Sequence, residues 1–380
     1  MINKILNRET PDRIVYAPNY WQWFAHHANH GILPDEIKDC ADQLEMIRRL
    51  GLDVFSRNIY CDQRRAWFGG LAEERWDGVE ATGEEEQCGG DLLFRKIYRT
   101  RSGELTERLK YIFEESTLVQ EEFLVDDYMN QLPVFREFVS GRRWSFDADR
   151  YRAEQEKVGP DGVVIAGELH SPLKMLHFLA NPVQTTYMLV DREDEVREIC
   201  ALHEEAQLDL VRQMAEAGVR VMMAMDNLDS TFHPPRYVEQ YSASFYQRAA
   251  EICHRHGALF FIHACGNQKA NLSLISSLGV DGLEGVAYPP LGDTQLDEAF
   301  AMTHDSFIIT GGISGIETGN LKSRDEVFRY VEDLFNRVRP YANRFVLSAS
   351  CNTSVDAKWE TLVHFRDAWR ELGSLTVEKE

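Results

Sequence analysis

A histidine and two cysteines occupy positions from which they could bind one metal ion. His263 and Cys265 are two positions apart, so their side chains lie on the same side of an extended strand. Cys351 could supply a third ligand and leave the fourth coordination position open for exchange, as in catalytic zinc sites. Two thiolates favour zinc over magnesium or calcium. The spacing alone leaves a second interpretation open, in which His263 and Cys265 simply pack inside a buried strand.

Three acidic side chains stand in or just after other apolar runs of the sequence. Glu168 ends the third run, Asp226 ends the fourth and Glu284 lies within the sixth. In a barrel of parallel strands, the carboxyl ends of the strands meet on one rim, and the catalytic groups of such barrels lie there. We therefore expect all three to be catalytic, with Glu168 and Asp226 as polar anchors or proton donors. For these two, a buried carboxylate with satisfied hydrogen bonds is the alternative.

The apolar runs alternate with amphipathic stretches, which is typical of parallel strands joined by helices. The expected fold is an α/β fold, a (β/α)8 or TIM barrel, in a single domain over residues 1–380. The expected strands are Arg13–Ala17, Asp53–Asn58, Gly162–Gly167, Arg220–Met225, Leu259–Ala264, Gly282–Val286, Ser306–Gly311 and Phe345–Ser350. The clearest expected helices are Asp35–Leu50, Val183–Ala217, Pro234–His256, Ser323–Val338 and Ala357–Leu372. Residues 61–125 predict an early insertion of antiparallel β-hairpins, after which residues 127–151 return to helix.

The composition narrows the class of protein. The chain has 41 Lys and Arg against 62 Asp and Glu and a formal net charge of −21, which repels nucleic acid and anionic membranes. No stretch approaches the roughly 20 apolar residues of a membrane span, and the first residues lack the apolar run of a signal peptide. Seven thinly spread cysteines do not form the pattern of a disulfide framework. We expect a cytoplasmic protein that binds neither nucleic acid nor membrane.

Aromatic and histidine side chains follow the first three expected strands. The loops that carry them belong on the rim, where flat apolar side chains could form a slot for an aromatic ring. The expected substrate-binding residues are Tyr20, Trp21, Trp23, Phe24, His26, His27, Tyr60, Trp67, Phe68 and His170. The alternative is that the aromatic residues pack the inserted segment against the barrel.

Five motifs resemble, in the same order, those of the uroporphyrinogen decarboxylase superfamily. They are Leu6–Val15, His256–Asn267 with its His-x-Cys-Gly, Gly279–Glu284, Ile309–Ile313 and Leu347–Cys351. Within the superfamily, the chain is similar to the zinc-dependent methyltransferases that act with corrinoid proteins, such as O-demethylase methyltransferase I and cobamide:coenzyme M methyltransferases. Decarboxylases of the superfamily carry an arginine-rich segment that grips substrate carboxylates, whereas residues 19–27 here contain no arginine. The decarboxylase activity is therefore not expected.

The resemblance implies that His263, Cys265 and Cys351 bind Zn²⁺, with Glu284 as a labile fourth ligand. It implies a methyltransferase that demethylates a methoxylated aromatic compound. The methyl group would pass to the Co(I) of a separate corrinoid protein, which brings the cobalamin and docks transiently. Two alternatives remain open: methyl transfer from a methylated corrinoid protein to a thiol such as coenzyme M, and a non-catalytic zinc-binding docking protein.

Overall fold

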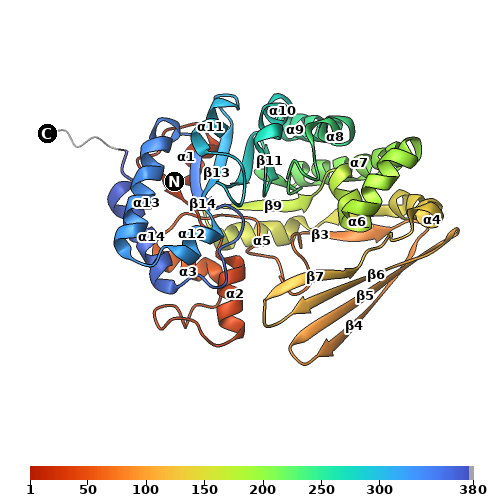
Figure 1. Cartoon of the computed structure of the whole chain (residues 1–380), viewed down its shortest axis with the longest axis horizontal. Coiled ribbons are helices and arrows are strands. Elements are labelled where there is room, and N and C mark those ends of the chain that lie inside the picture. The colour runs from red at the N-terminus through yellow and green to blue at the C-terminus, as the bar shows by residue number, and fades with distance from the viewer. Residues whose placement is uncertain (376–380) are drawn as a thin grey trace.

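Eight parallel strands form one curled sheet at the centre of the molecule (Figure 1). The computed structural model describes residues 1–375. The order along the sheet is β1-β14-β13-β12-β11-β10-β9-β2, and the N–H of Asp53, beside β2, donates to the carbonyl of Tyr16 in β1. The two outer strands therefore meet. The strands are β1 (Val15–Tyr16), β2 (Phe55–Ser56), β9 (Val163–Leu169), β10 (Val221–Met225), β11 (Leu259–His263), β12 (Gly282–Val286), β13 (Ile308–Ile313) and β14 (Phe345–Ala349).

Helices cover the outside of this sheet, so strands β9 to β14 are buried on both faces, as their apolar sequences predict. Inside the sheet, Ile2 and Ile5 of the first helix pack against strand side chains such as Val163 and Phe261. The helices are α1 (Ile2–Leu6), α2 (Trp21–Asn29), α3 (Gln43–Leu50), α4 (Tyr128–Gly141), α5 (Ala148–Val158), α6 (Pro172–Asp191), α7 (Glu193–Glu216), α8 (Pro235–Tyr241), α9 (Ala243–Arg255), α10 (Leu272–Ser277), α11 (Leu296–Ala301), α12 (Gly315–Asn320), α13 (Arg324–Val338) and α14 (Trp359–Leu372), with 3₁₀ turns at Lys269–Asn271 and Arg339–Tyr341. Among the described residues, no helix is both long and apolar enough to cross a bilayer.

Three expected helices are shorter or broken. Helix α3 begins at Gln43 because Asp42 caps it by accepting a hydrogen bond from the N–H of Glu45, so residues 35–41 are not part of it. The expected helix 183–217 divides at Arg192, between α6 and α7. The expected helix 234–256 divides at Ser242, between α8 and α9. In each case the amphipathic pattern continues across a local break that it does not reveal.

The inserted segment forms an antiparallel sheet that extends away from the curled sheet (Figure 1). Strands β4 (Glu80–Cys88), β5 (Asp91–Thr100), β6 (Gly103–Ile112) and β7 (Thr117–Glu122) pair with their neighbours in sequence. Strand β3 (Ala72–Trp76) instead pairs with β8 (Arg142–Phe146). The expectation of helix over residues 127–151 is therefore wrong at β8, because a partner about 70 positions earlier holds that segment extended.

Candidate metal centre and adjoining cavities

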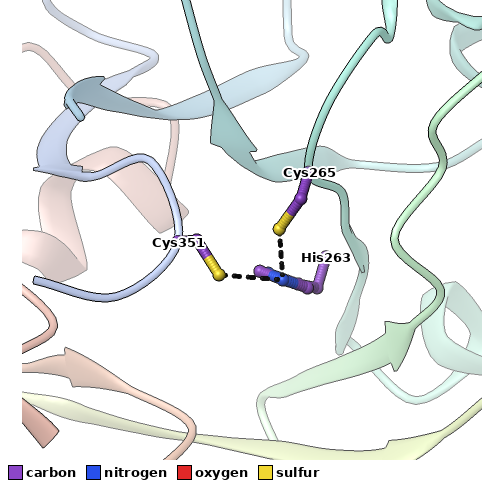
Figure 2. A group of neighbouring side chains, drawn as sticks. All are labelled: His263, Cys265 and Cys351. Carbon is purple, nitrogen blue, oxygen red and sulfur yellow. Dashed lines mark hydrogen bonds between the residues drawn. The ribbon is translucent and has the colours of Figure 1, made fainter. Parts of the chain in front are cut away.

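His263, Cys265 and Cys351 come together at one end of the curled sheet (Figure 2). His263 ends β11, Cys265 follows it by two residues, and Cys351 lies just beyond β14. The Nε2 atom of His263 is 3.1 Å from the sulfur of Cys265 and 3.8 Å from that of Cys351. Ligands of a tetrahedral zinc ion stand about 3.5–3.8 Å apart, given Zn–N and Zn–S bonds of about 2.1 and 2.3 Å. The three donor atoms, all within 4.8 Å of one another, therefore fit one zinc ion.

Glu284 lies on the opposite edge of the histidine ring from the two sulfurs. Its Oε2 atom is 2.5 Å from Nδ1 of His263 and 2.7 Å from Nε of Arg57. A carboxylate can only accept here, so Nδ1 carries the proton and Nε2 presents its lone pair to the metal position. As placed, Glu284 orients the ring and stands outside the group of three donor atoms.

The charges around the cluster favour thiolate. Burial acts against ionisation of Glu284, but Arg57 and His263 outweigh it and lower the pKa of its carboxyl to about 2. A hydrogen bond from Cys265 and the neighbouring His263 and Arg57 lower the pKa of Cys351, while the same thiol pairing and burial raise that of Cys265. The site thus holds one sulfur ready as an anion, which is the form that binds a metal.

A cavity of about 310 Å³ opens beside the cluster, with His263 and Cys351 in its wall. Of the expected substrate-binding residues, Trp21, Trp67 and Phe68 line it. The β6–β7 turn and the start of β7 contribute residues 116–118. A second cavity of about 300 Å³ shares Trp67 and Phe68 with the first. The inserted segment therefore builds part of the pocket wall.

Glu168 and His170 line the second cavity and not the one beside the cluster. The carboxylate of Glu168 accepts hydrogen bonds from the N–H groups of Gly70 and Leu71, and burial raises its pKa to about 7. Asp226 lines neither cavity; it accepts hydrogen bonds from the N–H of Ser171 and the hydroxyl of Tyr246. Both carboxylates are buried with their bonds satisfied, which is the alternative that the sequence left open.

The remaining expected substrate-binding residues do not reach either cavity wall. Four of them, Tyr20, Trp23, Phe24 and Tyr60, are buried in the core. Trp23 and Phe24 are on the buried face of α2. The hydroxyl of Tyr60, for example, donates to the carbonyl of Ile165 in β9. His26 bonds to the hydroxyl of Ser116, and His27 stacks on Trp23. These side chains therefore serve packing and contacts to other residues and do not form the cavity wall.

The structure adds polar residues that the sequence reasoning missed. Arg57, Gln63, Lys174, Asn227 and Asn352 line the cavity beside the cluster. The rule that strand ends form the rim could have identified Arg57 and Asn227, since each stands one or two residues after a strand. Lys174 lies in the first turn of α6, where nothing in its local pattern indicates a pocket.

The fold and the site together define an α/β protein. Its curled parallel sheet carries a His-Cys-Cys cluster at one end, with cavities lined by aromatic side chains beside it. A family model described as uroporphyrinogen decarboxylase (URO-D) matches residues 120–372. The match covers more than half of the chain, which therefore belongs to this family. It includes all three cluster residues but not the N-terminal motif Leu6–Val15. No curated protein sequence matches the chain.

Two solved structures are similar to this one. A methyltransferase from Methanosarcina mazei shares 16% sequence identity over 97% of each chain, with a TM-score of 0.60. That similarity supports the fold. A D-psicose 3-epimerase with D-tagatose from Clostridium cellulolyticum H10 shares 11% identity over 60% of this chain and 83% of that chain, with a TM-score of 0.34. A TM-score this low does not indicate a shared fold.

Proposed function

We propose that this protein is a zinc-dependent methyltransferase that demethylates a methoxylated aromatic compound and passes the methyl group to the Co(I) of a separate corrinoid protein. The observation that carries the proposal is that His263 and Cys351 of the three-residue cluster lie in the wall of a cavity that Trp21, Trp67 and Phe68 also line. The similar Methanosarcina mazei structure is itself a methyltransferase, which supports the same class of reaction.

The donor set fits zinc, with two sulfurs and one imidazole at suitable separations. Bound there, zinc would supply Lewis acidity to the ether oxygen from which the methyl group leaves. Glu284 and Arg57 hold the imidazole in one tautomer and orientation. Trp67 and Phe68 offer flat apolar surfaces to an aromatic ring.

We propose that the corrinoid stays on its own protein, which docks transiently over the mouth of the curled sheet. The proposed location is the cytoplasm, in keeping with seven cysteines of which none is in a disulfide. Transfer in the other direction, from a methylated corrinoid protein to a thiol, would use the same three ligands and is the second candidate. The aromatic walls of the cavity favour the first candidate, demethylation of a methoxylated aromatic compound.

The test combines zinc-loaded protein, a reduced corrinoid protein and a panel of aryl methyl ethers, with the cobalt absorption spectrum as readout. We expect methylation of the cobalt with wild type and none with Cys351→Ala. Cys88→Ala is the matched control, because Cys88 is exposed on β4 and far from the cluster in sequence and in fold. If a thiol alone supports turnover, the proposed direction of methyl transfer is wrong. A folded Cys351→Ala variant with full activity would refute the zinc mechanism.

A further inference from the structure

Lys174 places its amino group in the space around the metal centre, with no hydrogen-bond or ion-pair partner among the described residues. It lines the cavity that contains His263 and Cys351, and also a cavity of about 350 Å³ on the Cys265 side. Within residues 1–375, its Nζ atom forms no hydrogen bond or ion pair, and it lies 5.5 Å from the centre of the Phe178 ring, within the range of a cation–π contact. Asp226 is nearby, but Tyr246 and Ser171 already occupy its oxygens.

The position of Lys174 in α6 is unfavourable for a cation. Its backbone N–H donates to the hydroxyl of the capping residue Ser171, so the side chain belongs to the first turn of the helix. The helix dipole there repels positive charge and attracts negative charge. Burial lowers the pKa of the Lys174 amino group, although the nearby Asp226 and Cys265 act in the opposite direction, so holding the charge there has a desolvation cost. A bound anion would offset both the repulsion by the helix dipole and the desolvation cost.

Asn227 stands beside Lys174 in the walls of the same two cavities. Its backbone has φ +47°, in the left-handed region that asparagine adopts more readily than most residues other than glycine. Within the described residues, no hydrogen bond involves its side-chain amide, which is exposed to the cavities. A free side-chain amide next to Lys174 can donate a hydrogen bond to a ligand in these cavities.

The cavity beside the cluster suits one negative charge. Of its described lining residues, none is Asp or Glu, although the whole chain carries a net charge of −21. Its other cation, Arg57, is already paired with Glu284. One ammonium therefore remains, and it matches a monoanion better than a phosphate dianion. Trp67, Phe68 and Phe178 provide aromatic surface next to it.

From these observations we infer that the methyl donor is an aromatic acid, whose carboxylate binds Lys174 and Asn227 while its ring lies against Trp67 and Phe178. The inference rests on the proposed function and adds the substrate class. Binding forms a charge-assisted hydrogen bond and changes no covalent bond. Lys174 thereby selects acids over neutral ethers of the same shape.

The test measures binding by calorimetry on zinc-loaded protein, with 4-methoxybenzoate and the neutral 4-methoxybenzamide as probes. Wild type is expected to bind the acid roughly 10- to 100-fold more tightly than the amide, the effect of one charge-assisted bond. Lys174→Met removes the charge but keeps a similar chain length, and should abolish the preference with the amide affinity unchanged within about twofold. Lys174→Arg should restore part of it. Lys38→Met is the control, since Lys38 is exposed and pairs with Asp35 on the surface.

Equal binding of acid and amide by wild type would overturn the inference, as would equal weakening of both in Lys174→Met with unchanged thermal unfolding. Binding of 2-mercaptoethanesulfonate that depends on Lys174, without binding of the acid, would also overturn it and point to a thiol substrate. If the acid binds through Lys174 but no methyl reaches the corrinoid protein, the proposed function fails and the anion site stands. If the amide is demethylated as fast as the acid, the anion site fails and the proposed function stands.

Discussion

The imidazole of His263 is held at both nitrogens, and this arrangement decides what the residue can do. Nδ1 donates to Glu284, and Nε2 faces the sulfurs of Cys265 and Cys351. Arg57 in turn fixes Glu284 from the other side. The ring is therefore positioned for a metal before any metal binds, which lowers the cost of ordering it.

Glu284→Gln is expected to weaken zinc binding by about 10- to 100-fold, because an amide orients the imidazole less firmly than a carboxylate does. Competition with a chromophoric chelator measures the affinity. Glu298→Gln serves as control, since Glu298 is on the surface and pairs with Lys269. Unchanged zinc affinity in Glu284→Gln would show that the ion pair with Arg57 has only a structural role.

Glu168 gives the protein a dependence of stability on pH. Its pKa of about 7 in the folded state exceeds the unfolded value of about 4.3, so the folded state holds the proton more tightly. The stability gained in this way is complete below pH ~4.3 and is lost as the pH rises through about 7. The free energy of unfolding of wild type relative to Glu168→Gln should fall by up to about 4 kcal/mol over that interval. Denaturant titrations at a series of pH values measure both free energies. If the unfolding free energies of the two proteins change in parallel with pH, this prediction is contradicted.

At the level of residues, sequence reasoning found the three cluster positions because each stands at the end of an apolar strand. It could not find Lys174, whose role comes from the direction of α6 after β9. Nor could it place Glu284 correctly with respect to the histidine ring, since the side of the ring on which it lies depends on the pairing of β11 with β12. Trp23 and Tyr60 are aromatic, as expected for a binding slot, but their side chains pack in the core.

At the level of elements, the cluster depends on an irregularity in β12. The register of β12 with β13 shifts between Glu284 and Val286, and Gly285 there has φ +104°. A β-carbon at this position would lie against the carbonyl oxygen of Ala264 and 2.7 Å from that of Ser350. These two residues immediately precede Cys265 and Cys351, so the bulge sets the spacing of the two thiols.

Gly285→Ala should therefore cost at least about 3 kcal/mol of unfolding free energy and weaken zinc binding, because the backbone on both sides must move. Gly218→Ala is the matched control: its φ is +82°, but no atom lies within 4 Å of the added carbon. That variant should lose only about 1 kcal/mol and keep its zinc affinity. Similar losses of unfolding free energy in the two variants would mean that the crowding at Gly285 is relieved without movement of the metal ligands.

All eight core strands were predictable, since each is a short apolar run followed by a polar rim, and the observed bounds differ by a few residues. The apolar pattern does not define the order of the strands in the sheet, but the alternation with helices implied parallel neighbours, as observed. The inserted hairpins were visible from their glycine turns. Strand β8 was not, because β3 determines its conformation across the intervening sheet and helix.

At the level of the whole molecule, the three ligands join parts of the chain that are far apart. His263 and Cys351 are 88 positions apart, and β12 and β13 lie between their strands in the sheet. A metal ion held by both would bridge the end of the curled sheet. Ligands that bind only the folded state stabilise it in proportion to the logarithm of their concentration over Kd.

Removal of zinc with a chelator should thus lower the unfolding free energy of wild type by about 4 kcal/mol, when free zinc had been about 1000 times Kd. Differential scanning calorimetry should show the fall as a lower Tm. Cys351→Ala should show a much smaller response to the chelator. Identical melting of wild type with and without chelator would argue against a metal at this position.

The turn between β6 and β7 is fastened to α2, through Gln22 to the carbonyl of Ser116 and His26 to its hydroxyl. This turn supplies one wall of the cavity, whereas the thiols and the imidazole come from the strand ends of the curled sheet. One wall of the cavity and the metal-binding cluster are thus encoded in separate stretches of sequence. Exchanging the turn could diversify the compounds accepted while the reactive centre stays intact, so relatives with different specificities need differ little where the chemistry occurs.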